Sequence, residues 1–254
     1  MPLLEIRGLR RAFYGLDVLR GVDLAVRAGG ITGLIGPNGA GKTTLFNVIS
    51  GLVPAEGGTI RFDDRDITTF SADRVSRAGM VRTFQVARGF PRLSVFQHLM
   101  LYGRNQPGET LIQAILGTRA ARQREQALAE KAWETARFLR LDHLIDNPAT
   151  ALSGGQKKLL EIGRALMAEP KLVLLDEPTA GVNPTLQNEI GERLLELPRR
   201  GITVLLIEHD MGFIARLCDP VIVMAEGRVL TEGTFDAVRA DIRVREAYLG
   251  KRAA

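Results

Sequence analysis

Eight residues near the N-terminus, Gly36 to Thr43, have the types and spacing of a loop that binds phosphate. They read GPNGAGKT and fit the pattern G-x-x-x-x-G-K-[ST] in full. Small residues let backbone N–H groups turn inward, and a helix expected to start near Lys42 points its positive dipole end at the same place. Lys42 can reach outer phosphate groups, and the Thr43 hydroxyl can hold Mg²⁺. The alternative is a glycine-rich turn with a chance Lys-Thr pair, which the strand pattern before the loop and the helical pattern after it disfavour.

Two acidic residues follow a strongly apolar segment. Asp176 and Glu177 come directly after the run LVLL at 172–175. Ligands of parallel α/β sheets gather at the carboxyl ends of strands. We therefore expect Asp176 to bind a metal ion beside the phosphate loop, directly or through water, and Glu177 to polarise an attacking water molecule. The alternative interpretation is that Asp176 and Glu177 are ordinary solvated carboxylates.

A second small-residue loop, LSGGQ at 152–156, directly precedes a helical pattern. By the same physics it is a second anion site. One nucleotide in one chain does not obviously need two such loops, so the second loop is expected to serve a nucleotide held by another copy of the fold.

Single residues complete the candidate set. Gln85 follows the segment VRTF, and His209 follows the apolar run at 203–207, again at the end of an expected strand. A lone histidine is more often structural than functional. His98 and His143 receive that structural interpretation because no partner motif surrounds them, whereas His209 is expected at the same sheet edge as Asp176.

The elements that position these residues follow from hydrophobic patterning. Alternating segments at 3–9 and 22–30 predict strands, as do the segments at 31–36 and 58–64. The continuous apolar segments KLVLLDEP and TVLLIEHD are typical of parallel strands buried on both faces. A helical pattern at 185–197 lies between them, which predicts a right-handed crossover. Two strands joined at Glu226-Gly227 and one short helix are expected to close the chain.

The pattern in the middle of the chain, together with the length and charge of the whole chain, restricts the possible folds and partners. Residues 94 to about 144 are mostly helical by pattern, with Leu128, Ala132, Ala136 and Leu139 on one face. A chain of 254 residues can bury one large core, or one core with a smaller lobe. The net charge of +5 comes from arginines spread over the whole chain, which does not favour nucleic acid as a partner.

Targeting signals and disulfides are not expected. No uninterrupted apolar run approaches the ~20 residues that a membrane-spanning helix needs. The start of the sequence lacks the apolar core of a signal peptide. The single cysteine, Cys218, fits a reducing compartment. We therefore expect the protein to stay in the compartment where it is made.

The ordered set GPNGAGKT, Gln85, LSGGQ, LLDEP and His209 resembles the nucleotide-binding subunit of ATP-binding-cassette transporters. The likeness runs from about residue 3 to residue 250. It implies one α/β ATPase domain over 3–250: a P-loop NTPase with a RecA-like mixed core sheet, an N-terminal antiparallel β subdomain and a helical subdomain at about 90–160. A C-terminal helix and tail are expected at about 236–254.

The resemblance also implies roles for single residues. Phe13 is expected to stack on adenine, with Tyr14 the neighbouring candidate, and Gln85 is expected to sense Mg²⁺ and the membrane subunit. His209 is expected to contact the γ-phosphate of ATP, and Ser153 with Gly155 the γ-phosphate in the opposite subunit. The expected nucleotide-binding residues are Phe13, Gly36, Pro37, Asn38, Gly39, Ala40, Gly41, Lys42, Thr43, Thr44, Ser153, Gly154, Gly155 and Gln156. The expected catalytic residues are Glu177, His209 and Gln85, and the expected metal ligands are Thr43, Gln85 and Asp176.

Within this superfamily, RTFQVARGF and LIEHDM are similar to the branched-chain amino-acid ATPases, specifically the longer of their two paralogues. The same similarity is found in three other places: the segment that precedes LSGGQ, the segment AGVNP, and the ending REAYLG. Asn183 stands where many cassettes carry aspartate, which leaves open how this loop couples two sites.

That similarity implies an ATPase that powers a membrane importer of branched-chain or related amino acids. It also implies ATP and Mg²⁺ as cofactors, and a sandwich dimer on the cytoplasmic face of the membrane. The expected partners are a second ATPase subunit, identical or paralogous, and two integral membrane permease subunits. A periplasmic or extracellular solute-binding protein is an indirect partner. Nucleic acid is not expected as a partner.

Two rival functions remain. The ATPase of lipopolysaccharide export is similar around Gln85 and at YLG. Soluble cassette proteins of translation or DNA maintenance form the other class, but they usually join two cassettes or insert a long coiled coil, and neither feature is present here. The transported solute does not contact this subunit, so the sequence does not identify the solute.

Overall fold

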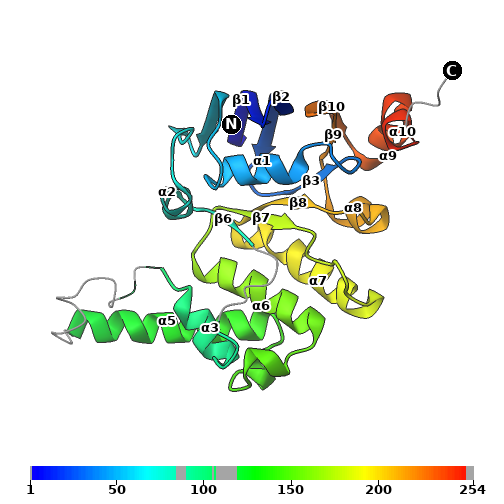
Figure 1. Ribbon diagram of the computed structural model, residues 1–254. Helices are drawn as coiled ribbons and strands as arrows, with labels where there is room; N and C mark the ends of the chain where they lie inside the picture. The colour runs from blue at the N-terminus through cyan, green and yellow to red at the C-terminus, as the bar shows by residue number, and fades with distance from the viewer. Residues whose placement is uncertain (1, 84–89, 105, 107–118, 250–254) are drawn as a thin grey trace. The chain divides into compact units, whose positions relative to one another are not determined.

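The computed structural model describes residues 2–83, 90–104, 106 and 119–249. Its chain forms two compact units (Figure 1). The first unit comprises Met1–Arg82, Lys171–Pro178 and Leu194–Ala254. The second unit comprises Thr83–Pro170 and Thr179–Arg193.

A six-stranded mixed sheet forms one layer of the first unit, in the order β10-β9-β3-β8-β7-β6. Its strands are β3 (Ile31–Ile35), β6 (Met80–Arg82), β7 (Leu172–Asp176), β8 (Thr203–Ile207), β9 (Val221–Ala225) and β10 (Arg228–Gly233). All neighbouring pairs are parallel except β10 with β9. Every residue of β3 and β8 is buried, as the continuous apolar runs predict.

The first unit also contains a four-stranded antiparallel sheet in the order β2-β1-β4-β5. Its strands are β1 (Pro2–Phe13), β2 (Leu16–Arg27), β4 (Gly57–Phe62) and β5 (Arg65–Asp66). Helix α1 (Lys42–Ile49) lies between β1–β2 and β3 (Figure 1). Buried side chains of both sheets and of α1, with Phe46 and Phe62 among the largest, form one hydrophobic cluster. The two sheets therefore share one core, and α1 is anchored inside it.

The remaining helices of the first unit are short. They are α2 (Ala72–Ala78), α8 (Met211–Leu217), α9 (Phe235–Ala240) and α10 (Ile242–Leu249), with a 3₁₀ turn at Pro198–Arg200. The sequence predicts one short C-terminal helix, whereas the structure has two. Asp241 separates them because its backbone is extended (φ −67°, ψ 121°) and its carboxylate accepts a hydrogen bond from the Arg243 N–H at 2.9 Å. This is the arrangement by which an aspartate starts a new helix.

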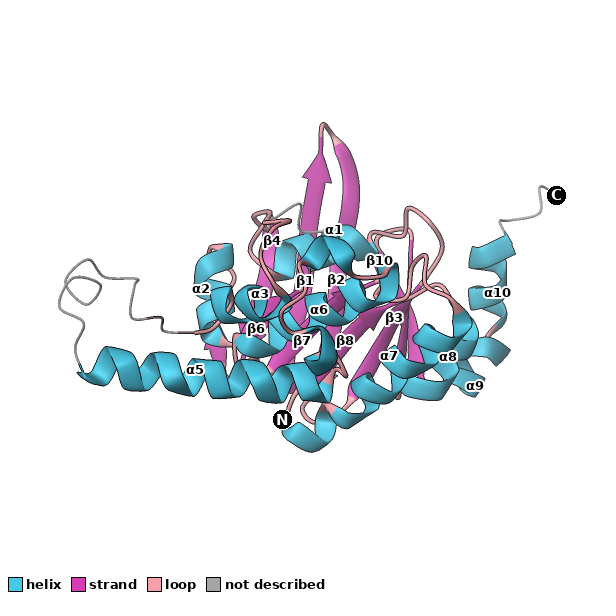
Figure 2. Ribbon diagram, turned by 90° about the horizontal axis from the view of Figure 1, so that it is seen from below, coloured by secondary structure: helices cyan, strands magenta, loops and turns pink. Residues whose placement is uncertain are grey.

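The second unit is helical. It contains α3 (Val95–Leu101), α5 (Arg119–Phe138), α6 (Gly154–Met167), most of α7 (Pro184–Glu196), and 3₁₀ turns at Asp142–Leu144 and Ala149–Ala151. Figure 2 shows α5 as a long regular helix. The predicted apolar face is confirmed, since Leu128, Ala132, Ala136 and Leu139 are buried.

A buried polar pair links two helices of the second unit. The Arg164 guanidinium donates to Nδ1 of His98 at 2.9 Å, and the other ring nitrogen of His98 lies 3.1 Å from the Phe90 carbonyl oxygen. Because Nδ1 accepts from arginine, Nε2 must carry the proton that it donates to Phe90. His98 is therefore a structural residue, as its surroundings in the sequence indicate.

Within the part of the chain that the structure describes, no helix has the length and apolar character needed to cross a membrane.

Candidate functional site

The loop between β3 and α1 is shaped by two glycines that no other residue could replace without movement. Gly36 has φ 151°, and a Cβ there would lie 2.1 Å from the Met224 carbonyl oxygen. Gly41 has φ 99°, and a Cβ there would lie 3.0 Å from the Val18 carbonyl oxygen. The loop is thus pressed against the ends of neighbouring strands. By contrast, Gly39 has a positive φ but open space around it.

The first turn of α1 keeps its backbone donors available. Its N-cap residue is Gly41, no side chain caps the helix, and no acidic residue lies in its first turn. The N–H groups at a helix N-terminus have no partner within the helix. Since they combine with the positive end of the helix dipole, this end of α1 is suited to bind an anion.

Lys42 is held inside the loop. Its side-chain nitrogen donates to the Gly36 carbonyl at 2.7 Å and to the Pro37 carbonyl at 3.0 Å, and the residue is only 7% exposed. Burial lowers the pKa of Lys42, whereas the nearby carboxylates of Glu177 and Asp176 favour its charged form and oppose that shift. The cation is therefore positioned between backbone carbonyls and two acids, and a phosphate group can replace the carbonyls as its partner.

Asp176 and Glu177 lie at the carboxyl end of β7, beside the end of β8. The backbone N–H of Glu177 donates to the Ile207 carbonyl at 2.9 Å, and Glu177 has φ 49°. A positive φ is uncommon for a residue with a side chain, and such residues cluster at functional sites. His209 follows β8, and its Nε2 donates to Oε1 of Glu177 over 2.7 Å. The two residues that the sequence assigned separately are thus in direct contact.

Arg82 is a site residue that the sequence analysis missed. Its guanidinium donates to Oδ2 of Asp176 at 2.9 Å and to Oδ1 of Asn47 at 2.5 Å. The side chain is 8% exposed, so the ion pair is largely shielded from water. Arg82 ends β6, which pairs with β7, and this position at a strand's carboxyl end is the signal that could have identified it. The arginine holds the Asp176 carboxylate in place.

The donor set at this edge fits Mg²⁺ bound together with phosphate. Thr43 is exposed at the start of α1, and the Asp176 side chain is 14% exposed. The described residues contain no group of three or more His, Cys, Asp or Glu side chains that could hold a metal ion alone. Mg²⁺ is usually bound by one or two protein oxygens plus substrate phosphates and water. Thr43 and Asp176 are residues of that kind.

Two aromatic residues lie where β1 ends. Phe13 pairs with Leu16 of β2, and the Arg11 guanidinium lies 4.7 Å from the centre of its ring. Tyr14 has φ 51° and is fully exposed in the turn between the strands. Phe13 is therefore the more restrained of the two rings.

The loop at 152–156 lies in the second unit and opens α6. The Ser153 hydroxyl accepts from the Gln156 N–H at 3.3 Å, and the Gln156 side-chain oxygen accepts from the Ser153 N–H at 2.8 Å. This reciprocal pair is a capping box. A Cβ on Gly155 would lie 1.7 Å from the Leu186 side chain, whereas Gly154 has open space. Gly155 thus has a packing role between α6 and α7 that its sequence position did not reveal.

In the first unit, the structure therefore brings the loop Gly36–Thr43, with its Lys42, together with Asp176, Glu177 and His209. Ser153 to Gln156 belong to the second unit. Gln85 lies outside the described residues.

Comparisons with known proteins agree on one family. A family model described as "ABC transporter" matches residues 19–180, and one described as "Branched-chain amino acid ATP-binding cassette transporter" matches residues 228–254. The chain is 40% identical over 250 residues to a protein of Archaeoglobus fulgidus named probable branched-chain amino acid transport ATP-binding protein LivG. That alignment covers 98% of this chain and 96% of the relative.

A second relative and a solved structure extend the agreement. The Pseudomonas aeruginosa protein named high-affinity branched-chain amino acid transport ATP-binding protein BraF is 35% identical over 251 residues, covering 98% of each chain. A crystal structure of an ATP-binding cassette of an ABC transporter in its ADP conformation superposes with a TM-score of 0.85 at 38% identity, covering 99% of this chain and 100% of that one. The predicted fold class is confirmed.

Proposed function

The chain belongs to the ABC transporter family, and from that premise we propose that it is the ATP-hydrolysing subunit of an importer for branched-chain amino acids. The observation that carries the proposal is the first-unit site, in which an uncapped helix N-terminus, Lys42 and the Glu177–His209 pair lie together. The relatives' printed names and the match over 228–254 support the solute class.

The residues of the site divide the work of hydrolysis. The backbone N–H groups at the start of α1 and the Lys42 ammonium bind the phosphates and stabilise the charge that develops on them. Mg²⁺, when bound with ATP, neutralises phosphate charge, and Thr43 and Asp176 are its proposed ligands. Arg82 orients the Asp176 carboxylate.

Glu177 is the proposed general base. Its carboxylate accepts the proton of the attacking water, and the hydrogen bond from His209 Nε2 orients that carboxylate. His209 is also the proposed contact for the γ-phosphate of ATP. Phe13 is the proposed adenine platform, because an aromatic face stacks on any base.

The remaining assignments concern partners. We infer that Ser153 and its loop face a nucleotide held by a second ATPase subunit, identical or paralogous. Two integral membrane permease subunits would bind the ATPase at the cytoplasmic face of the membrane, and a solute-binding protein would act through them. Gln85 is proposed to sense Mg²⁺ and the permease.

Reconstitution tests the solute class. The chain is co-expressed with candidate permease subunits and a solute-binding protein from the same genome. The complex is purified and placed in vesicles with ATP inside. Uptake of labelled leucine, isoleucine or valine is expected, and the Lys42→Ala complex should show none. ATP-dependent extraction of lipopolysaccharide without amino-acid uptake would contradict the proposal and favour the export system instead.

A further inference from the structure

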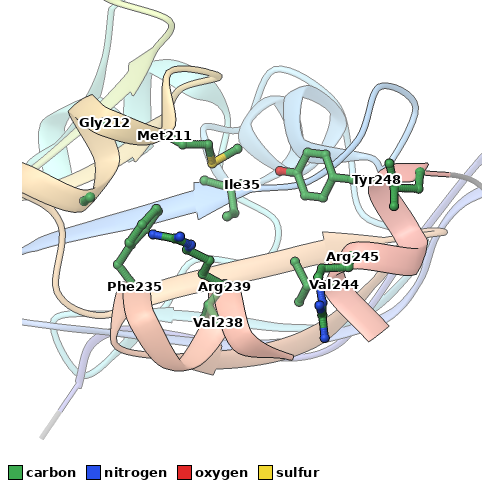
Figure 3. A pocket seen from close by; sticks show the side chains of 11 residues that line it. Ile35, Met211, Gly212, Phe235, Val238, Arg239, Val244, Arg245 and Tyr248 are labelled. Atoms are coloured by element: carbon green, nitrogen blue, oxygen red, sulfur yellow. The ribbon is translucent and has the colours of Figure 1, made fainter. Parts of the chain in front are cut away.

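An apolar hollow of about 680 Å³ lies in the first unit, between the two C-terminal helices and the central sheet (Figure 3). Its apolar walls come from β3, α8, α9 and α10. Among them are Ile35, Met211, Phe235, Val238 and Val244. This volume is within the range of ~300–1,000 Å³ that is usual for small-molecule pockets. None of the phosphate-binding loop from Gly36 to Thr43 lines it, so the hollow is separate from the proposed ATP site.

One cation lies at the rim of this apolar space. The exposed Arg239 side chain lies beside Phe235, whereas Arg245 points away from Ile35 (Figure 3). The Arg239 guanidinium forms no hydrogen bond or ion pair with another residue of the described part of the chain. A guanidinium at the edge of apolar walls is complementary to an anion that carries an apolar body.

The lining also excludes a class of ligand. None of the eleven residues around the hollow is acidic. An amino acid would therefore leave its ammonium group without a partner in an apolar setting, which costs free energy. The complementary ligand has one negative charge, an apolar chain and no positive charge.

The hollow is connected to the phosphate-binding loop through Tyr248. This residue lines the hollow from α10, and its hydroxyl lies close to the backbone of Gly36. Burial raises the pKa of Tyr248, and the nearby Gly36 backbone opposes that shift. Ile35, which directly precedes Gly36, lines the same hollow from β3. A ligand that packs against Tyr248 and Ile35 therefore acts on residues next to the first glycine of the loop.

We propose that the hollow between α8, α9 and α10 is a regulatory site for a small alkyl monocarboxylate, whose carboxylate pairs with Arg239 and whose occupancy alters nucleotide binding through Tyr248 and Gly36. The site is independent of the solute that the transporter carries.

Calorimetric titration of the full chain tests the binding step with three probes: octanoate, octanol and leucine. Octanoate should bind about tenfold or more tightly than octanol, because it adds a charge-assisted contact to the same apolar chain. Leucine should show no binding at concentrations that saturate with octanoate.

Two matched variants assign the cation. Arg239→Gln should weaken octanoate about tenfold and leave octanol unchanged, whereas Arg245→Gln removes the same charge nearby and should change neither. Equal affinity for octanoate and octanol, equal losses in both variants, or binding of leucine would each overturn the proposed ligand class. Dimerisation of the chain that octanoate reverses would show that a second copy fills the hollow, and would overturn it too.

Tyr248→Phe tests the connection, since it keeps the ring and removes only the hydroxyl. In the unchanged protein, saturating ADP should alter octanoate affinity about fivefold, and octanoate should alter ADP affinity by the same factor because coupling is reciprocal. In Tyr248→Phe, both probes should still bind but the factor should fall to one. Octanoate binding that is unaffected by ADP in the unchanged protein would overturn the regulatory role. ADP binding without any octanoate binding would overturn this site and leave the ATPase assignment intact.

Discussion

Two glycine-rich loops in this molecule each precede a helix, yet only one of the two helices has its N-terminus capped by side chains. Before α1, the N-cap is Gly41 and no side chain caps the helix, so its first-turn N–H groups remain available. Before α6, Ser153 and Gln156 cap each other. Loops with similar composition thus leave the first turn of the helix uncapped in one unit and cap part of it in the other.

The difference bears on what each loop can do alone. The first loop also contains Lys42 and lies beside two carboxylates, so it has the parts of a complete phosphate site. The second loop has no charged residue between Leu152 and Gln156. An anion there would have to share the Ser153 hydroxyl with the capping bond. We therefore expect the first loop to set nucleotide affinity, and the second loop to matter only when a partner subunit brings a phosphate to it.

The largest expected effect is on the chemistry of the first unit. Glu177→Gln should reduce ATP turnover about 10²–10⁴-fold, because the amide keeps the size of the side chain but cannot accept the proton. ATP should bind at least as well, since a negative charge is removed. Steady-state phosphate release and equilibrium binding of ATP measure the two effects. Glu232→Gln, the same change at an exposed position of β10, is the matched control and should change neither.

The same variant tests the partner arrangement. If ATP holds two subunits together and hydrolysis separates them, Glu177→Gln should accumulate as an ATP-bound dimer in size-exclusion chromatography. The Glu177→Gln variant is run first alone and then mixed with the equivalent mutant of a paralogous ATPase subunit. A dimer only in the mixture indicates a heterodimer, whereas a monomer in both, or near-normal turnover, contradicts the mechanism.

The second prediction separates two glycines of the first loop. The Cβ added by Gly39→Ala would have no atom within 4 Å. This variant should lower the unfolding free energy by about 1–2 kcal/mol, because alanine is penalised in a left-handed backbone conformation. The Cβ added by Gly36→Ala would lie 2.1 Å from the Met224 carbonyl oxygen, so that carbonyl must also move. Gly36→Ala should therefore lower the unfolding free energy further than Gly39→Ala, and it should also weaken nucleotide binding. Denaturant unfolding of both variants provides the comparison. Equal stability would show that the loop is not pressed against β9.

The third prediction concerns the adenine platform. Phe13→Ala should weaken ATP binding by about 1–3 kcal/mol, the value of a base–aromatic stack, and Tyr14→Ala should have little effect. Equilibrium binding of ATP by each variant decides between them. The reverse pattern would move the stacking residue one position along the chain.

The smallest expected effects on stability and on nucleotide affinity belong to the second loop. Ser153→Ala should cost about 1 kcal/mol of unfolding free energy through the lost cap and leave ATP affinity of the isolated chain unchanged. Ser153→Arg should likewise leave ATP binding nearly intact but stop turnover, because it blocks the loop offered to a partner. Weakened nucleotide binding in the isolated chain would place this loop in the chain's own site and end the contrast between the two loops.

Much of the fold could be predicted because its signals are local. The apolar runs of β7 and β8 identify buried parallel strands, and the glycine pattern followed by Lys42 identifies the start of α1. The helix boundary at Asp241 was missed because its cause is a short-range side-chain bond to Arg243 rather than a break in periodicity.

The sequence by itself determined which chemical groups are available and at which strand and helix ends they stand, since residue type, hydrophobic period and small-residue loops act over a few residues. Only the tertiary structure decided which of them meet. Arg82 donates to Asp176 and His209 donates to Glu177 across long stretches of chain. The capping box of Ser153 is local, but the packing of Gly155 on Leu186 is not. Such contacts depend on strand order and on the close approach of backbones, which are set by packing of the whole core and leave no periodic trace in the sequence.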